Sequence, residues 1–165
     1  MKKNRLKDLL EKFESEKRSS PDFKEFSNEL NDYLSRKIAV NNPKLARDLE
    51  QKLKDGKRED ILDFAKETKN KINRKIGHYG LFRTANDVFV FLLSNIRATF
   101  ITRIQSKIRS KDFKSYEIDD LISEHIIDKL WEDCQISTLF DDFDELYGLL
   151  YLLTGNCHID WDIEI

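Results

Sequence analysis

The sequence is poor in the residues that turn a chain and in those that crosslink it. It holds five glycines and two prolines in 165 residues, whereas 36% of the residues are charged. A turn-rich β fold needs more chain-reversing residues than this, so the composition favours long helices. The two cysteines, Cys134 and Cys157, lie far apart and form no CxxC pair. This spacing excludes a disulfide-rich secreted scaffold and predicts reduced thiols.

The sequence also lacks an apolar run long enough to span a bilayer. Residues 88–93 are all apolar, but a spanning helix needs about 20 such residues. The first residues, MKKNRLKDLL, are charged where a signal peptide would be apolar. We therefore expect a cytoplasmic protein without a membrane partner. A chain of this length can bury a substantial core without metals or disulfides.

Apolar residues recur at intervals of three and four through most of the chain, which is typical of amphipathic helices. The core helix is expected at residues 84–108, where Thr84 or Asn86 would be the cap. Other helices are predicted from Leu6 to near Ser19, from Pro21 to the Asn41-Asn42-Pro43 break, over 44–54, over 58–76 with Gly77 closing it, over 116–134 with Ser115 as cap, and over 141–153.

These patterns predict an all-α fold: a single helical bundle-like domain of about six helices around a buried central helix, with a short extended C-terminal tail. Residues 1–40 are expected to form an amphipathic helical arm and residues 41–165 the helical core, within one domain overall. Whether the arm packs on the core or mediates dimerisation is open, so an oligomer is one possibility.

Charge is distributed unevenly along the chain. Residues 1–80 hold 21 basic and 15 acidic residues, whereas residues 81–165 hold 8 and 16. From Glu117 onward Lys129 is the one basic residue against 14 acidic ones. A surface of that sign repels nucleic acid and attracts a basic partner, although a merely soluble exterior is the more common meaning of such a pattern.

Three groups of residues have side chains that could bind a metal ion or catalyse a reaction, but none has the spacing or setting that favours such a role. Cys134, Cys157, His125 and His158 have the donor types for zinc but not the spacing of a zinc site, and adjacent Cys157 and His158 side chains would point apart as a catalytic pair. Asp141, Asp142, Asp144 and Glu145 could bind a hard cation, but equally form the cap and solvent face of a helix. We expect no catalytic residue, no metal and no cofactor.

The segment Arg74-Lys75-Ile76-Gly77-His78 resembles the arginine-to-histidine signature of HEPN ribonucleases. The match lacks the polar residue after the arginine and has too short a gap before the histidine. A histidine in a connecting loop that touches the backbone is the favoured interpretation, and an RNase remains a minor alternative.

The far end of the 84–108 helix and the loop after it are basic. Residues 83–114 hold seven basic residues and two acidic ones. Such a face could follow nucleic-acid phosphates, or could pair with the acidic helices of the same chain or of another subunit; we favour the pairing. The residues concerned are Arg97, Arg103, Lys107, Arg109, Lys111 and Lys114.

The segment from Leu146 to Trp161, LYGLLYLLTGNCHIDW, is the least generic part of the chain. It resembles the closing sequence of helical domains in ABC-three-component systems, the prokaryotic conflict systems that include the Lamassu anti-phage type. The resemblance implies a helical module that couples an effector, such as a nuclease, to an SMC-like ATPase, and allows contact with DNA through the complex. No nuclease-like sequence precedes the motif, so we expect an accessory subunit or an excised domain.

The sequence therefore predicts a non-catalytic assembly subunit. Glycine and asparagine at positions 155 and 156 would allow left-handed geometry at the end of the last helix. Ile159 and Trp161 could then pin the tail on the core or into a partner's groove. The residues expected to bind protein are Trp161, Ile159, Tyr147, Tyr151, Asp141, Asp142, Asp144 and Glu145; the alternative is nucleic-acid binding through Arg97, Arg103, Lys107 and Arg109.

Overall fold

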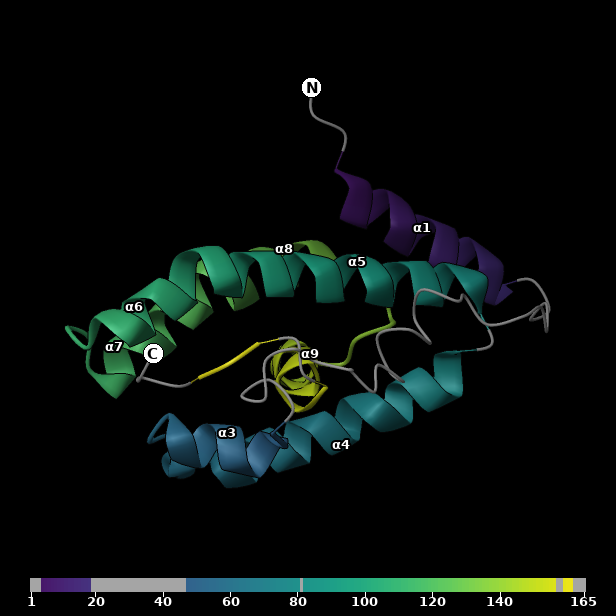
Figure 1. The fold of residues 1–165 in the computed structure, drawn as a ribbon. Helices are drawn as coiled ribbons and strands as arrows, with labels where there is room; N and C mark the ends of the chain where they lie inside the picture. Colours follow the sequence, from purple (N-terminus) through teal and green to yellow (C-terminus); the bar gives the residue numbers. More distant parts are fainter. Residues whose placement is uncertain (1–3, 19–46, 81, 157–158, 162–165) are drawn as a thin grey trace.

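The computed structural model describes residues 4–18, 47–80, 82–156 and 159–161, and every regular element among them is helical. With the labels of Figure 1, the elements are α1 (Arg5–Arg18), α3 (Leu49–Asp55), the short 3-10 turn η1 (Glu59–Ile61), α4 (Leu62–Tyr79), α5 (Arg83–Thr99), η2 (Phe100–Ile104), α6 (Gln105–Ser110), α7 (Ser115–Ile122), η3 (Ser123–Ile127), α8 (Asp128–Cys134) and α9 (Asp144–Gly155). The predicted all-α, bundle-like fold is confirmed. The helix predicted from Pro21 and the boundary at residues 40 and 41 lie outside the described residues.

Helix α9 is the most enclosed element. Figure 1 shows it end-on between a layer that contains α5 and α8 and a layer that contains α3 and α4. Nine of its twelve residues are buried, which fits a segment that is apolar on all sides. Helix α5 is buried mainly on one side, because Val90 and Phe91 remain partly exposed. The core is therefore built around α9 as much as around the predicted 84–108 helix.

Gly148 lets α9 lie directly against α4. A Cβ atom at Gly148 would lie 2.3 Å from the carbonyl oxygen of Thr68, and 3.1 Å from the Cβ of Ile72. Any side chain would push the two helices apart, so the glycine is required by this close approach. In contrast, Gly77 meets nothing and lies inside α4, which continues to Tyr79. The predicted stop at Gly77 is wrong, because one glycine costs only about 1 kcal/mol in a helix that packing holds in place.

Two long helices each contain a π-helical segment. Helices α5 and α6 are joined through η2, and α7 and α8 are joined through η3. Buried residues recur every four positions along both: Ile96, Phe100, Ile104 and Ile108 in the first, and Ile118, Ile122, Ile126, Leu130 and Cys134 in the second. An α-helix has about 3.6 residues per turn, so a spacing of four drifts around it. A π turn takes one more residue and returns these side chains to one face.

Helix α1 packs on the core through Leu6, Leu9, Leu10 and Phe13, all of which are buried. The ring of Phe13 lies edge-on to Tyr79, with centroids 5.5 Å apart. The carboxylate of Glu16 accepts hydrogen bonds from the backbone N–H groups of Arg83 (3.1 Å) and Thr84 (3.0 Å). The start of α5 is therefore capped from α1, and not by the side chain of Thr84 or Asn86 as predicted.

Other helix ends differ from prediction for local reasons. Helix α3 begins at Leu49, because the Asp48 side chain accepts the N–H of Gln51 as an N-cap, and the start predicted at Lys44 lies outside the described residues. The residue before α7 is Lys114, whose N–H donates to the carboxylate of Glu117, so Ser115 is the first helical residue and not the cap. Helix α9 begins at Asp144, because the carboxylate of Glu145 reaches back to the N–H of Asp141.

Candidate functional site

The segment after α9 folds back onto the core. Ile159, Asp160 and Trp161 are all buried, and Trp161 is only 1% exposed. The indole N–H of Trp161 donates to the hydroxyl of Thr154 at 3.0 Å. Its ring lies near Phe100 (centroids 5.1 Å apart) and stacks with Tyr151 (6.2 Å). The tail is thus pinned on the protein's own core, the first of the two arrangements that the sequence left open.

A buried lysine holds this segment in place. The ammonium group of Lys52, on α3, donates to the carbonyl oxygens of Thr154 (2.7 Å) and Ile159 (2.8 Å). The last carbonyls of a helix have no partner within the helix, and a cation at that end also complements the helix dipole. Arg47 adds an ion pair with the buried Asp160 at 2.9 Å. We call Lys52, Thr154, Ile159 and Trp161 the C-terminal clasp.

Gly56 is needed for space beside the clasp, whereas a side chain at Gly155 would meet mainly the flexible end of Lys69. A Cβ atom at Gly56 would lie 2.4 Å from the carbonyl oxygen of Trp161, and one at Gly155 would lie 2.7 Å from the ammonium of Lys69. No described glycine has a positive φ angle, and Asn156 has a φ of −101°. The left-handed geometry expected at Gly155 and Asn156 is therefore wrong. Helix α9 ends there because Lys52 takes its terminal carbonyl.

Arg58 lies against the clasp from the other side. Its guanidinium carbon is 5.8 Å from the centroid of the Trp161 ring, and its Nη2 donates to the carboxylate of Asp119 at 2.8 Å. Its Nε donates to Asp60 at 3.1 Å. Burial by itself would lower the pKa of Arg58, but the bonds to Asp60 and Asp119 outweigh it and raise the pKa above its ordinary value. Its Nη1 is buried and has no partner.

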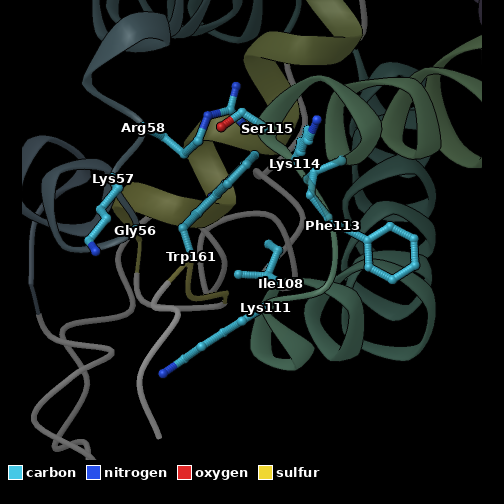
Figure 2. Close-up of a pocket in the computed structure, with 10 residues that line it drawn as sticks. Gly56, Lys57, Arg58, Ile108, Lys111, Phe113, Lys114, Ser115 and Trp161 are labelled. Atoms are coloured by element: carbon cyan, nitrogen blue, oxygen red, sulfur yellow. The ribbon is translucent and has the colours of Figure 1, made fainter.

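A cavity of about 500 Å³ opens beside Arg58 and Trp161. Figure 2 shows the Arg58 side chain beside the Trp161 ring, with Ile108 and Lys111 coming from the opposite wall. Four of its ten lining residues are basic and none is acidic. The lining is Gly56, Lys57, Arg58, Ile108, Lys111, Phe113, Lys114, Ser115, Ile118 and Trp161.

The residues predicted to bind protein are divided between core and surface. Ile159, Trp161 and Tyr151 are buried by the chain itself, and burial raises the pKa of the Tyr151 hydroxyl well above its usual range. Tyr147 is half-buried, and burial raises its pKa as well. Ile159, Trp161 and Tyr151 therefore keep almost no exposed surface in this structure.

The acidic segment before α9 is paired with α4. Lys71 contacts Asp142 at 2.7 Å, and Lys75 lies 3.1 Å from Asp141 and 2.6 Å from the fully buried Glu145. These ion pairs attach the start of α9 to α4. The segment keeps Asp144 partly exposed, and next to it Phe143, which is 50% exposed.

The basic residues at the end of the long α5–α6 helix are not used in this way. Arg97, Arg103, Lys107 and Arg109 are exposed, and none forms an ion pair with another described residue. Lys107 instead lies over the ring of Phe113, 5.3 Å from its centroid. The described residues therefore do not show the pairing within the chain, and the carboxylates at the start of α9 are instead taken by the lysines of α4. Pairing with another subunit stays a prediction.

The groups considered for chemistry are dispersed. Burial raises the pKa of the Cys134 thiol to about 12, which keeps it protonated and unreactive. Arg74 and His78 are exposed one turn apart on α4, so His78 is helical and not in the predicted loop. Within the described ranges, no group of three His, Cys, Asp or Glu side chains could hold a metal ion. Cys157 and His158 lie outside them.

Sequence reasoning missed Lys52, Gly56, Arg58 and Phe143. Lys52 carried a usable signal, since it shares one helical stripe with Leu49 and Leu53, where a lysine is out of place. No such signal marks Arg58 or Gly56, because their roles depend on Trp161, more than 100 positions away. In the part of the chain that the structure describes, no helix has the length and apolarity to cross a membrane.

A family model for C-terminal domain 9 of the ABC-three component systems matches residues 48–161, a range that includes the cavity and the C-terminal clasp. No curated protein matches this chain, and neither does any solved structure.

Proposed function

Because the chain belongs to the family of C-terminal domain 9 of the ABC-three component systems, we propose that it is a non-catalytic assembly subunit of such a defence complex. In this proposal it couples an effector nuclease to an SMC-like ATPase, as in Lamassu-like systems. Family membership supports a place for this chain in an ABC-three component system that has other subunits. The adaptor role is our proposal.

The observation that carries the adaptor role is an exposed aromatic residue in an acidic setting. Phe143 comes directly before α9, the most buried helix, yet half of its surface is open to solvent. Its ring lies near that of Tyr147, with centroids 6.4 Å apart. We define Asp141, Phe143, Asp144 and Tyr147 as the α9-start surface. An aromatic anchor bordered by carboxylates suits a partner pocket that is apolar inside and basic at its rim.

The rigidity of this surface supports the same role. The ion pairs of Lys71 with Asp142 and of Lys75 with Glu145 fix the segment to α4. A surface that is already ordered loses little conformational entropy on binding, so more of the contact energy appears as affinity.

We expect Phe143→Glu to weaken association with the other subunits about thirtyfold, the effect of losing about 2 kcal/mol at an interface anchor. The measurement is co-purification of the tagged chain with the other subunits of its own system, followed by titration of the purified components. Tyr116→Glu is the matched control, because Tyr116 is a 61% exposed aromatic residue at the start of α7. Equal binding by both variants would rule out the α9-start surface.

Nucleic-acid binding is a second candidate, favoured by the exposed basic residues of the α5–α6 helix that make no ion pair within the described residues. If it is correct, duplex DNA shifts in a gel at low salt, the shift weakens as salt rises, and Arg103→Glu with Lys107→Glu abolishes it. Lys129→Glu, at an exposed lysine of α8, serves as the control for charge reversal. No shift at low salt would remove this candidate.

A further inference from the structure

The charge of the cavity beside the clasp is the first sign of a ligand. Lys57, Lys111 and Lys114 line it and form no ion pair with a described residue. Arg58 brings a fourth positive charge, while Asp60 and Asp119, which hold it, contribute two negative ones. Lys114 lies 6.0 Å from the centroid of the Tyr116 ring, and the Glu117 carboxylate takes its backbone N–H. The cavity therefore remains positive and attracts an anion.

Arg58 supplies an unused hydrogen-bond donor. Its side chain is only 6% exposed, and of its nitrogens Nη1 has no partner although it is buried. A buried donor on a charged group that has no partner lowers the stability of the fold more than an ordinary lost hydrogen bond does. A bound ligand that accepts from it would explain why it is there. Arg58 lines the cavity, so a rotation of its guanidinium group would bring this donor to the oxygens of an anion there.

The backbone around the cavity is unusual in the same place. Among described residues, the non-glycine positions with positive φ are Lys57 (58°) and Lys111 (62°), and both line the cavity. This left-handed geometry is unfavourable for a non-glycine residue, and glycine is the common choice at such positions. Lys57 follows the end of α3 and Lys111 the end of α6, so each has the geometry common after a helix, with a lysine in place of the usual glycine that adds charge to the cavity.

Helix α7 adds a favourable electrostatic field. Its first residue, Ser115, lines the cavity with a hydroxyl group, and the helix continues through η3 and α8 to Cys134. The N-terminus of a helix carries partial positive charge and unpaired N–H groups, an arrangement that often binds phosphate. The remaining wall is apolar, with Ile108, Ile118 and Trp161, and the volume lies within the range of small-molecule sites.

We propose that this cavity binds a phosphate monoester, carried either by a free nucleotide or by the 5′ end of a nucleic-acid strand. In this proposal the phosphate oxygens accept from Arg58 and Ser115, and the body of the ligand lies against Ile108 and Ile118. The three lysines point to different sides in Figure 2 and make the surroundings of the phosphate positive. A phosphate suits the cavity better than a carboxylate does, because it offers more acceptors and up to two charges to four cations and a helix N-terminus. This site is independent of the α9-start surface.

The test is isothermal titration calorimetry on the full chain with AMP, adenosine and inorganic phosphate. We expect AMP and phosphate to bind with an affinity that falls as salt rises, and adenosine not to bind. Trinucleotides with 5′-phosphate and 5′-hydroxyl ends separate the two sources: if the 5′-phosphorylated strand binds tighter than AMP, the ligand is a strand end, and if it does not, the ligand is a nucleotide.

Lys111→Gly is the informative variant, because glycine accepts the left-handed backbone and should keep or raise the melting temperature. We expect it to weaken AMP binding at least tenfold, whereas Lys129→Gln, which removes an exposed charge of α8 outside the cavity, should leave it unchanged. Equal weakening by both, or no binding of AMP and phosphate at low salt, would overturn the proposal. So would binding that is seen only after Asp162→Asn with Glu164→Gln, since the chain's own carboxylates would then be the occupants.

Discussion

Trp161→Ala is expected to lower the free energy of unfolding by about 3–5 kcal/mol, the range for removing a buried tryptophan or phenylalanine from a core. Trp161 is 1% exposed and lies near Phe100 and Tyr151, so the substitution leaves a large void between the tail and two helices. It also removes the hydrogen bond to Thr154. Domains of this size have about 5–15 kcal/mol in total, so the loss is a large part of the stability.

Urea unfolding followed by helical circular dichroism measures this loss. Trp131→Ala is the matched control, because Trp131 lies on α8 and is only partly buried. We expect it to cost clearly less than Trp161→Ala. If the two variants unfold at the same urea concentration, the C-terminal clasp does not contribute to the core as the geometry indicates.

Lys52→Met is expected to cost about 3 kcal/mol, although methionine has nearly the same length and is more apolar. The reason is the two carbonyl oxygens of Thr154 and Ile159, which lose their buried donor. A buried acceptor left without a partner costs about 1–3 kcal/mol. The same urea titration measures the effect, and hydrogen exchange should show the last turn of α9 opening more often than in the unsubstituted chain.

Lys66→Met separates this effect from the general loss of a lysine. Lys66 is exposed on α4 and lies 3.5 Å from Glu50, and an exposed pair of this kind contributes at most about 1 kcal/mol. Should Lys52→Met be no more costly than Lys66→Met, the buried lysine would not be the device that holds the tail.

Both predictions rest on the structural role of the segment LYGLLYLLTGNCHIDW. Gly148 allows α4 to lie close to α9, and Thr154 accepts a hydrogen bond from the indole N–H of Trp161. Trp161 packs against the core beside Gly56. The residues that carried the resemblance to the ABC-three-component domains are thus largely folding residues. Partner contact is proposed instead for Phe143, which lies just before the motif and is half exposed.

Most of the secondary structure could be predicted because helices are local. The hydrogen bond from residue i to i−4 and the repeating apolar face both depend on residues close together in the sequence. The helices predicted at 84–108 and 116–134 therefore agree with the observed bounds to within two residues. The strict four-residue spacing from Ile96 to Ile108 and from Ile118 to Cys134 also contained the π segments, since an ordinary α-helix cannot keep that spacing on one face.

The candidate site was only partly predictable. Sequence reasoning named Trp161, Lys111 and Lys114, but it assigned the first to a partner surface and the other two to a basic face. It did not link them with Arg58, because nothing in the neighbourhood of Arg58 indicates the distant tryptophan. Likewise the sequence indicates an exposed acidic face at Asp142 and Glu145, because nothing near them in the chain shows that Lys71 and Lys75 of α4 lie beside them.

The sequence by itself determined that the chain is helical, roughly where its helices lie, and that its closing segment resembles one family. The tertiary structure decided which of these residues meet: Lys52 under the end of α9, Glu16 at the start of α5, and a basic cavity formed by residues 56–58, 108–118 and 161. The physical reason is the distance along the chain over which each kind of interaction acts. Helix formation depends on neighbours four residues apart, whereas burial and charge pairing depend on contacts between segments that the sequence places far from one another.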